Sequence, residues 1–335
     1  MFRFKIIENN DKEWQEIISK SKNYDFYHTS IFHKIDNTFT SRLLYFGDEN
    51  NFIALPIVLR PIENTSYFDI TSVYGYSGPF YTYEKNFEND LIDFFQHNFK
   101  QFCVKNQVIS VFSRLHPLLE QQSILKNIGE IVELNKTISI VLTNKEIAKR
   151  NYRSSLKQEL KQIENDEVIV EVATSEDEID QFIEIYYETM DRVKAENYYY
   201  FEKPYFLEFL KNNEFNAELL VARKNGLMIA GAIFTSTNQL MQYHLAGTVN
   251  NSLKIKAMKT IVDKAIDSGI SRGMSELHLG GGVGGSDDDN LFLFKSSFSK
   301  DFKRFSIWKY VINKEIYDKL SKGKAESNYF PLYRS

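Results

Sequence analysis

The sequence predicts a two-domain α/β protein in which one order of helices and strands is used twice, each time as a mixed, mostly antiparallel sheet flanked by helices. Its 335 residues suffice for two ordinary domains, each with its own core. The apolar helix stripe Trp14, Ile17 and Ile18 has a counterpart 165 positions further along the chain. In both halves three consecutive strands precede alternating helices and strands. This order predicts a sheet that is antiparallel at first and partly parallel later.

The composition is that of a folded protein, with 43% hydrophobic and 15% aromatic residues. A net charge of −4 argues against a wide basic surface for duplex nucleic acid, although it is compatible with a local basic stripe. The single Cys103 excludes an internal disulfide framework and a multi-cysteine zinc site. No apolar run reaches the roughly 18 residues that cross a bilayer, and residues 1–10 alternate as in a strand rather than a signal peptide. We therefore expect a cytoplasmic protein without metal or membrane contact.

The first half begins with an alternating strand at about 2–7, then a helix that starts at the cap Asn10, with Glu13 completing a capping box. A second helix is expected after Ser30. The remaining elements, in order, are strands at about 42–46, 52–60 and 67–71, an amphipathic helix at about 88–105, a strand at 108–112, a short helix near 118–127 and a strand at 137–142.

The second half repeats this order. A strand at 168–172 leads to a helix that is capped by Ser175 and Glu178 and carries the repeated stripe. Pro204 suits the first turn of the next helix, and Asn225-Gly226 is a strong hairpin signal between two strands. The elements from there on are strands near 217–223, 227–235 and 240–246, a helix at 253–272, a strand at 275–279, a short helix near 290–298 and a strand at 304–312.

We therefore predict domains at residues 1–145 and 165–335, joined by a linker helix at 146–164. Apolar residues of this linker, Leu156, Leu160 and Ile163, predict a helix packed across the junction. The segment is also basic, and its cations are Lys145, Lys149, Arg150, Arg153, Lys157 and Lys161.

This order of elements, used twice, resembles the GNAT acyltransferase fold in tandem, and particular stretches resemble FemAB-like enzymes. In the second half these stretches are Tyr243–Thr248, Leu277–Gly282 and Leu291–Phe298. In the first half they are Phe26–Thr29, Tyr74–Pro79 and Arg114–Pro117. Each motif is loose, but their order along the chain is specific.

The resemblance implies an acyltransferase of one of two kinds. The kind we favour is a sugar N-acyltransferase, in which acyl-coenzyme A donates an acetyl or 3-hydroxybutanoyl group to a dTDP-linked 3-amino-3,6-dideoxyhexose for O-antigen or capsule synthesis. The other kind is a FemX-like transferase, which moves an amino acid from aminoacyl-tRNA to a peptidoglycan precursor. A third hypothesis is a non-catalytic protein that binds a sugar nucleotide. The oligomeric state stays open.

The resemblance implies that the second domain binds the acyl donor. In GNAT folds the thioester lies between two splayed strands, here 240–246 and 275–279, so backbone N–H groups of Leu245 and Gly247 would face its carbonyl. The pyrophosphate of coenzyme A would lie at the N-terminus of the helix at 253–272. The usual glycine signature is absent there, and direct charge from lysines would have to replace it. The candidate residues are Asn251, Ser252, Lys254 and Lys256.

A glycine-rich loop follows the second splayed strand. Gly280–Gly285 lacks the βαβ unit of a dinucleotide site, so Gly281 and Gly282 are candidates for close approach to a ligand or for a structural turn. Asp287–Asp289 lack calcium-loop spacing, and we interpret them as a solvated loop or a helix cap.

Three side chains are candidates for catalysis. Lys295 lies in a Phe-Lys-x-x-Phe segment that resembles the position of a lysine at the acyl-transfer centre of bridge enzymes without a coiled-coil arm. His244 is a possible proton acceptor, because an unperturbed histidine titrates near pH 6.5. His28 is the third, on the side of the first domain. The alternatives are an ion pair or a surface position for the lysine and core packing for both histidines.

We expect the first domain to bind the acceptor. Tyr74 and Tyr76 would stack on a sugar or a base, and Arg114 would bind a phosphate. His116 and Tyr199 are further candidates for substrate contacts. The alternative for the tyrosines is a turn that closes the first core.

Overall fold

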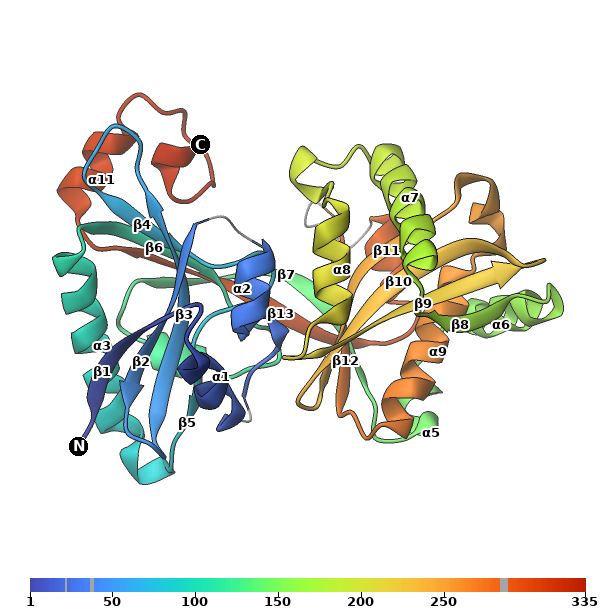
Figure 1. The fold of residues 1–335 in the computed structure, drawn as a ribbon, viewed down its shortest axis with the longest axis horizontal. Helices are drawn as coiled ribbons and strands as arrows, with labels where there is room; N and C mark the ends of the chain where they lie inside the picture. The colour runs from blue at the N-terminus through green and yellow to red at the C-terminus, as the bar shows by residue number, and fades with distance from the viewer. Residues whose placement is uncertain (22, 37–38, 284–288) are drawn as a thin grey trace. The chain divides into compact units, whose positions relative to one another are not determined.

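The computed structural model describes residues 1–21, 23–36, 39–283 and 289–335 (Figure 1). The chain forms two compact units. Unit 1 consists of Met1–Leu134 and Arg304–Ser335, and unit 2 consists of Asn135–Lys303. Each unit is a mixed sheet with helices against it, which confirms the predicted fold class.

Among its described strands, the sheet of unit 1 is antiparallel except for one parallel pair, β4 with β6. Its strands, in spatial order, are β1 (Arg3–Glu8), β2 (Thr40–Gly47), β3 (Phe52–Pro61), β4 (Phe68–Thr71), β6 (Val108–Arg114) and β13 (Asp301–Val311), with β5 (Phe80–Thr82) beside β3. The helices are α1 (Lys12–Ser19), α2 (Ser30–Asp36), α3 (Glu88–Lys105), α4 (Gln122–Leu125) and α11 (Lys314–Ser321). The 88–105 prediction is confirmed by α3, which buries Leu91, Phe95 and Phe99 in the core.

The part of unit 2 that the structure describes has one parallel pair as well, β11 with β12. Its strands, in spatial order, are β7 (Glu130–Val141), β12 (Glu276–Gly280), β11 (Leu240–Thr248), β10 (Leu227–Thr237), β9 (Asn216–Lys224) and β8 (Ile169–Ala173). The helices are α5 (Lys145–Arg150), α6 (Ser154–Asn165), α7 (Glu176–Val193), α8 (Lys203–Lys211), α9 (Met258–Ser271) and α10 (Asn290–Lys295), with 3-10 turns η3 (Asn197–Tyr199) and η4 (Asn250–Ile255).

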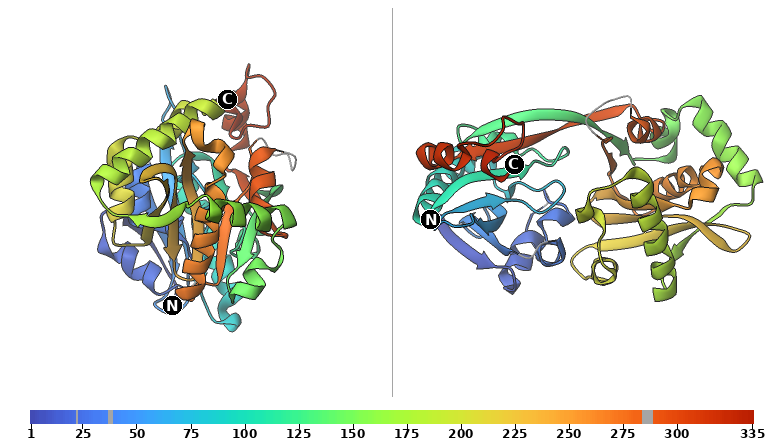
Figure 2. Two further views of the ribbon diagram at one scale, coloured as in Figure 1. Left: turned by 90° about the vertical axis from the view of Figure 1, so that its right-hand side faces the viewer. Right: turned by 90° about the horizontal axis from the view of Figure 1, so that it is seen from above.

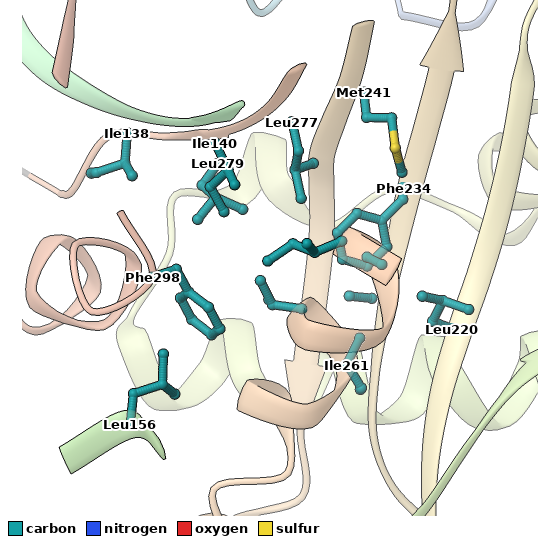
Figure 3. Packing of buried hydrophobic residues seen from close by; sticks show 14 of the residues in the cluster. Ile138, Ile140, Leu156, Leu220, Phe234, Met241, Ile261, Leu277, Leu279 and Phe298 are labelled. Carbon is teal, nitrogen blue, oxygen red and sulfur yellow. The ribbon is translucent and has the colours of Figure 1, made fainter. Parts of the chain in front are cut away.

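The main core of unit 2 lies between α9 and the sheet. Ile261 of α9 packs against Leu220, Phe234 and Leu277 of the strands, and Leu156 of α6 closes the cluster (Figure 3). In Figure 2, α9 lies in orange against the yellow strands β9 and β10. On α7, the predicted capping box between Ser175 and Glu178 is present.

The boundaries of the two units differ from the predicted domains 1–145 and 165–335. Residues 304–335 belong to unit 1, where β13 pairs with β6, and residues 135–145 belong to unit 2, where β7 pairs with β12. The last strand of each repeat is therefore exchanged. A pattern of alternation shows that a strand exists but carries no information on which edge it pairs with.

Three local predictions are corrected by the structure. The cap of α1 is Asp11, whose carboxylate accepts the Glu13 N–H at 2.9 Å, rather than Asn10. The predicted linker helix at 146–164 is two helices, α5 and α6, interrupted at residues 151–153. The predicted helix at 253–272 begins with the 3-10 turn η4, and its α-helical part starts at Met258.

Candidate functional site

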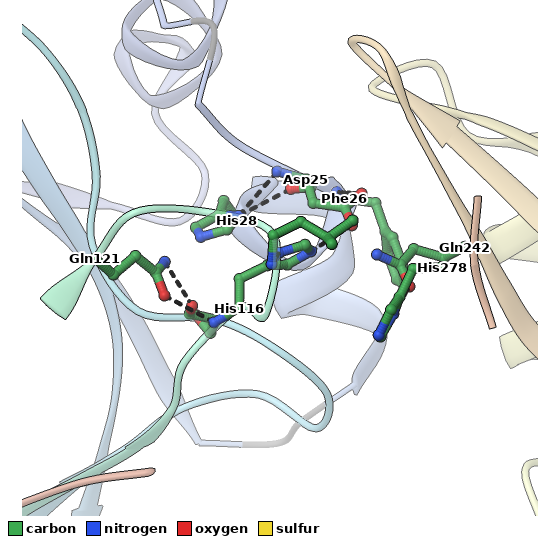
Figure 4. Close-up of polar contacts among 9 residues, drawn as sticks. Asp25, Phe26, His28, His116, Gln121, Gln242 and His278 are labelled. Atoms are coloured by element: carbon green, nitrogen blue, oxygen red, sulfur yellow. Dashed lines mark hydrogen bonds and ion pairs between the residues drawn. The ribbon is translucent and has the colours of Figure 1, made fainter. Parts of the chain in front are cut away.

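The two central strands of unit 2 separate after a short paired stretch. In the described residues, β11 and β12 pair only from Leu240–Glu276 to Gln242–His278. The buried Nδ1 of His278 donates to Oε1 of Gln242 at 2.8 Å, at the last paired position (Figure 4). Beyond this pair every second N–H group of β11 points away from β10, into the opening between the strands. This is the splay that the sequence predicts.

His244 lies at an irregularity of the strand next to this opening. Tyr243 is opposite Phe234 and Leu245 is opposite Ile233, so His244 is an extra residue on β11, a β-bulge. Its ring stacks on Phe209 of α8, with centroids 4.6 Å apart.

The same histidine has a defined polar partner. Its Nε2 lies 2.8 Å from the hydroxyl of Tyr205, also on α8. Tyr243, by contrast, packs with the hydrophobic cluster under α9. The bulge therefore presents His244 towards α8 and Tyr243 towards α9.

Lys295 is a buried lysine at the open end of β12. It is 7% exposed, and its Nζ donates to the Gly281 carbonyl at 2.7 Å and lies 5.6 Å from the centroid of the Tyr243 ring. Burial lowers the pKa of Lys295 to about 7, against a smaller opposing effect of the Asp289 charge. The structure thus brings together Lys295, Gly281 and Tyr243 but places His244 with α8.

In the described part of the glycine loop, Gly282 leaves no room for a side chain and Gly281 leaves little. A Cβ at Gly282 would lie 1.7 Å from Oδ2 of Asp289, and one at Gly281 would lie 3.1 Å from the Lys136 carbonyl. Asp289 caps α10 by accepting the Leu291 and Phe292 N–H groups, which agrees with the helix-cap interpretation. Gly284–Asp288 lie outside the described residues.

Leu245 and Gly247, the predicted carbonyl contacts, are both buried in β11. A Cβ at Gly247 would lie 2.8 Å from the Ile185 carbonyl of α7, so this position requires glycine for packing. Tyr199, a predicted substrate contact, is half-buried, and its carbonyl accepts the Tyr186 hydroxyl at 2.8 Å. Substrate roles for these residues stay predictions.

The residues predicted to bind pyrophosphate precede α9. Asn251, Ser252 and Lys254 lie in η4, and Lys256 follows in the left-handed conformation, with φ of 61°. The Nζ of Lys256 is 2.6 Å from a carboxylate oxygen of Glu159 on α6. Sequence reasoning did not single out Glu159.

The basic segment at 145–161 divides into two sets. Lys145 and Lys149 form ion pairs with Asp263 and Asp267 on α9, and these pairs fasten α5 to that helix. The other set is exposed and forms no ion pair among the described residues; its members are Arg150, Arg153, Lys157 and Lys161. About a third of the predicted basic stripe, two of its six cations, therefore has a structural role.

In unit 1, His116 and His28 lie in a buried polar network rather than at an open surface (Figure 4). The Leu118 N–H donates to Nδ1 of His116, so the proton is on Nε2, which donates to Oδ2 of Asp25 at 3.0 Å. His28 accepts the Asp25 N–H at its Nδ1, at 3.1 Å. Burial, reinforced by the neighbouring His116, lowers the pKa of His28 to about 4. These contacts agree with the core-packing alternative for His28, and the catalytic role of His28 and the substrate role of His116 stay predictions.

The loop at residues 74–79 is held by the same network. Nε2 of Gln121 donates to the Ser77 and Pro79 carbonyls at 2.8 and 2.9 Å. A Cβ at Gly75, where φ is 106°, would lie 2.1 Å from the Tyr27 ring. Tyr76 packs its ring edge-on to Tyr27, with centroids 5.9 Å apart. This packing supports the alternative that Tyr76 closes the first core.

Tyr74 and Arg114 form a different arrangement in unit 1. The half-buried Arg114 guanidinium lies 5.4 Å from the centroid of the Tyr74 ring and 5.9 Å from that of Phe112. The Tyr74 N–H donates to Oδ2 of Asp36 at 2.8 Å. Burial raises the pKa of Asp36 to about 6, although this hydrogen bond and Arg114 oppose the shift. Arg114 is thus held in place by two rings, an arrangement suited to binding an anion.

Comparison with known proteins agrees with this geometry. Residues 150–304, almost all of them in unit 2, match the acetyltransferase (GNAT) domain family. No curated protein sequence matches the chain. The structure of FemX is similar over 95% of this chain and 99% of its own, with a TM-score of 0.72 and 11% identity.

Two further solved structures share the fold. L-PGS from Bacillus licheniformis has a TM-score of 0.63 and 14% identity, over 92% of this chain and 94% of its own. A conserved protein of unknown function from Bacteroides thetaiotaomicron VPI-5482 has a TM-score of 0.62 and 11% identity, over 93% of this chain and 100% of its own.

The chain therefore shares its fold with FemX, and residues 150–304 match the GNAT domain family. The domain match supports acyltransferase activity. GNAT domains use acyl-coenzyme A, so this is the acyl donor that the family implies. No helix among the described residues is long and apolar enough to span a membrane.

Proposed function

We propose that the protein is an N-acyltransferase that joins an activated acyl group to a primary amine where β11 and β12 separate. The observation that carries this proposal is Lys295, a buried lysine in the part of the chain that matches the GNAT family. Its Nζ is bonded to the loop after β12 and lies 5.6 Å from the centroid of the Tyr243 ring on β11. Burying an amine is costly, and perturbed titratable groups of this kind gather at catalytic sites.

The proposed reaction consists of three changes. The amine nitrogen forms a bond to the acyl carbon, the bond from that carbon to the carrier breaks, and the amine loses a proton. We assign the negative oxygen of the tetrahedral intermediate to Lys295 and to the N–H groups of β11 that face the splay. The proton passes from the amine to solvent, and a catalytic role for His244, which the bulge places with α8, stays a prediction. The departing carrier is then protonated from solvent.

We further propose that the acceptor is a nucleotide-linked amine, bound by unit 1. Arg114, fixed between Tyr74 and Phe112, is suited to a phosphate of such a compound. A dTDP-linked amino sugar and a nucleotide-linked peptidoglycan precursor both belong to this class.

Two donors are consistent with the site. Acyl-coenzyme A is favoured by the GNAT domain match and belongs with the sugar acceptor. Aminoacyl-tRNA belongs with the peptidoglycan precursor and is favoured by the exposed cations Arg153, Lys157 and Lys161 on and beside α6.

The proposal is tested with purified protein and both donor–acceptor pairs, by mass spectrometry of the amide product. We expect one pair to give product and Lys295→Met to lower its rate by about 10²–10³, with Lys300→Met as the exposed control. Nucleotide binding without product from any donor would support the non-catalytic hypothesis. Equal rates for wild type and Lys295→Met would contradict the role of the lysine.

A further inference from the structure

The residues before α9 differ from a pyrophosphate cradle in their backbone. In a GNAT fold, free N–H groups at this position would face the pyrophosphate of coenzyme A. Here the Ser252 N–H donates to the Val249 carbonyl at 2.9 Å, and the Lys256 N–H donates to the Leu253 carbonyl at 3.2 Å. The 3-10 turn η4 therefore uses donors that a ligand would need.

The side chains at this helix end are occupied as well. Glu159 of α6 accepts hydrogen bonds from Lys256, at 2.6 Å, and from Lys259 in the first turn of α9. The Glu159 side chain is only 20% exposed, because α6 packs against α9. A carboxylate from the chain itself thus binds the two lysines that a phosphate at this helix end would need.

This carboxylate is charged at neutral pH. Burial disfavours the charged form, but the hydrogen bonds and charges of Lys256 and Lys259 together outweigh burial and lower the pKa of Glu159. A pyrophosphate at this helix end would have to displace Glu159 from its two lysines or lie beside its negative charge. Both alternatives cost free energy.

We propose that Glu159 is a specificity-determining residue that closes the N-terminal end of α9 to coenzyme A. This inference rests on the proposed acyl transfer and concerns only the carrier of the acyl group. It disagrees with the donor that the GNAT family implies. Of the two donors considered above, it favours aminoacyl-tRNA, which contains no pyrophosphate.

The test is calorimetric titration of acetyl-coenzyme A into wild type, Glu159→Gln and Glu164→Gln. Glu164 is exposed on the same helix and forms no ion pair among the described residues, so its variant controls for the loss of one negative charge. We expect no saturation of wild type or Glu164→Gln below about 1 mM. Because Glu159→Gln removes one adjacent negative charge, it should bind acetyl-coenzyme A at least about tenfold more tightly than wild type does. This gain in affinity should shrink at high salt.

The gain in affinity for acetyl-coenzyme A should also depend on the lysines that Glu159 releases. We expect the double variant with Lys256→Met and Glu159→Gln to lose most of this gain. The inference is overturned if wild type binds acetyl-coenzyme A at micromolar concentrations, a result that does not depend on the folding of any variant. It is also overturned if Glu159→Gln, with an unchanged circular dichroism spectrum, gains no affinity. If Glu159→Gln does not fold, Glu159→Asp replaces it, because the shorter side chain withdraws the carboxylate from the lysines.

Failure of this inference can be told apart from failure of the proposed function. The titration needs neither acceptor nor turnover, whereas the effect of Lys295→Met is measured on product. Tight binding of acetyl-coenzyme A to wild type would remove the role of Glu159 and leave acyl transfer in place.

Discussion

Replacing Lys295 by methionine should stabilise unit 2 while it removes activity. Methionine has a similar length and carries no charge, so it fits the buried position without the cost of burying an amine. Lowering the pKa from 10.5 to about 7 corresponds to about 5 kcal/mol, because one pKa unit is worth about 1.4 kcal/mol. The lost hydrogen bond to the Gly281 carbonyl returns about 1 kcal/mol of this. The expected net gain at about pH 6–7 is therefore roughly 3–4 kcal/mol.

The sign of the pH dependence follows from proton binding. The unfolded chain keeps the Lys295 proton up to about pH 10.5, whereas the folded protein loses it near pH 7. Between these values the unfolded chain binds more protons, so the stability of the wild type rises with pH by about 1.4 kcal/mol per unit. The methionine variant lacks this term, and its advantage should fall to roughly 1 kcal/mol at about pH 9.

Urea unfolding at about pH 6 and about pH 9 measures this difference. Circular dichroism reports the unfolding of both units. Tryptophan fluorescence reports unit 1 alone, because Trp14 and Trp308, the only tryptophans of the sequence, both lie there. Lys295→Met should shift the dichroism transition and leave the fluorescence transition in place. The exposed Lys300→Met is the control. A stability difference that is the same at both pH values would refute the reasoning.

Two further predictions concern unit 1. Asp69 is fully buried and binds Nε of Arg60 at 2.8 Å and Nε of Arg334 at 2.5 Å. Asp69→Asn should therefore destabilise the protein by about 3–5 kcal/mol, and limited proteolysis should show earlier cleavage in residues 322–335. Acidification should also destabilise unit 1, because the unfolded chain binds a proton at His28 near pH 6.5 and the folded protein only near pH 4. His28→Asn should flatten the plot of unfolding free energy against pH in this range. An unchanged plot would count against the role of His28.

The elements that follow from local chemistry were predictable. The stripe of α3 and the Asn225-Gly226 turn need only neighbouring residues, and both positions of the turn adopt positive φ, 52° and 77°. Strand exchange was not predictable, because β7 and β13 look like ordinary final strands of their own repeats. Their partners are chosen by the whole sheet rather than by local pattern.

Some residues of the candidate site could likewise be found from the sequence, and others could not. Lys295 was found through a resemblance that covers a contiguous segment, and the structure adds its burial. Glu159 was missed because it looks like an ordinary surface acid on a basic helix; it acquires meaning only through lysines about a hundred positions away. The bulge at His244 was also missed, since an extra residue leaves no trace in the composition of a strand. Asp25 carried a usable signal, because it caps the turn at Phe26–His28.

The exchanged strands set an order of events during synthesis. Domains of a growing chain usually fold from the N-terminus onwards. Here unit 2, residues 135–303, is complete on the ribosome before residues 304–335 of unit 1 have been made. Until then β6 has an open edge where β13 will pair, and such an edge is prone to pair with other chains. The half that begins the chain is therefore the last to mature, and a message truncated after residue 303 would yield a finished second unit joined to an aggregation-prone first one.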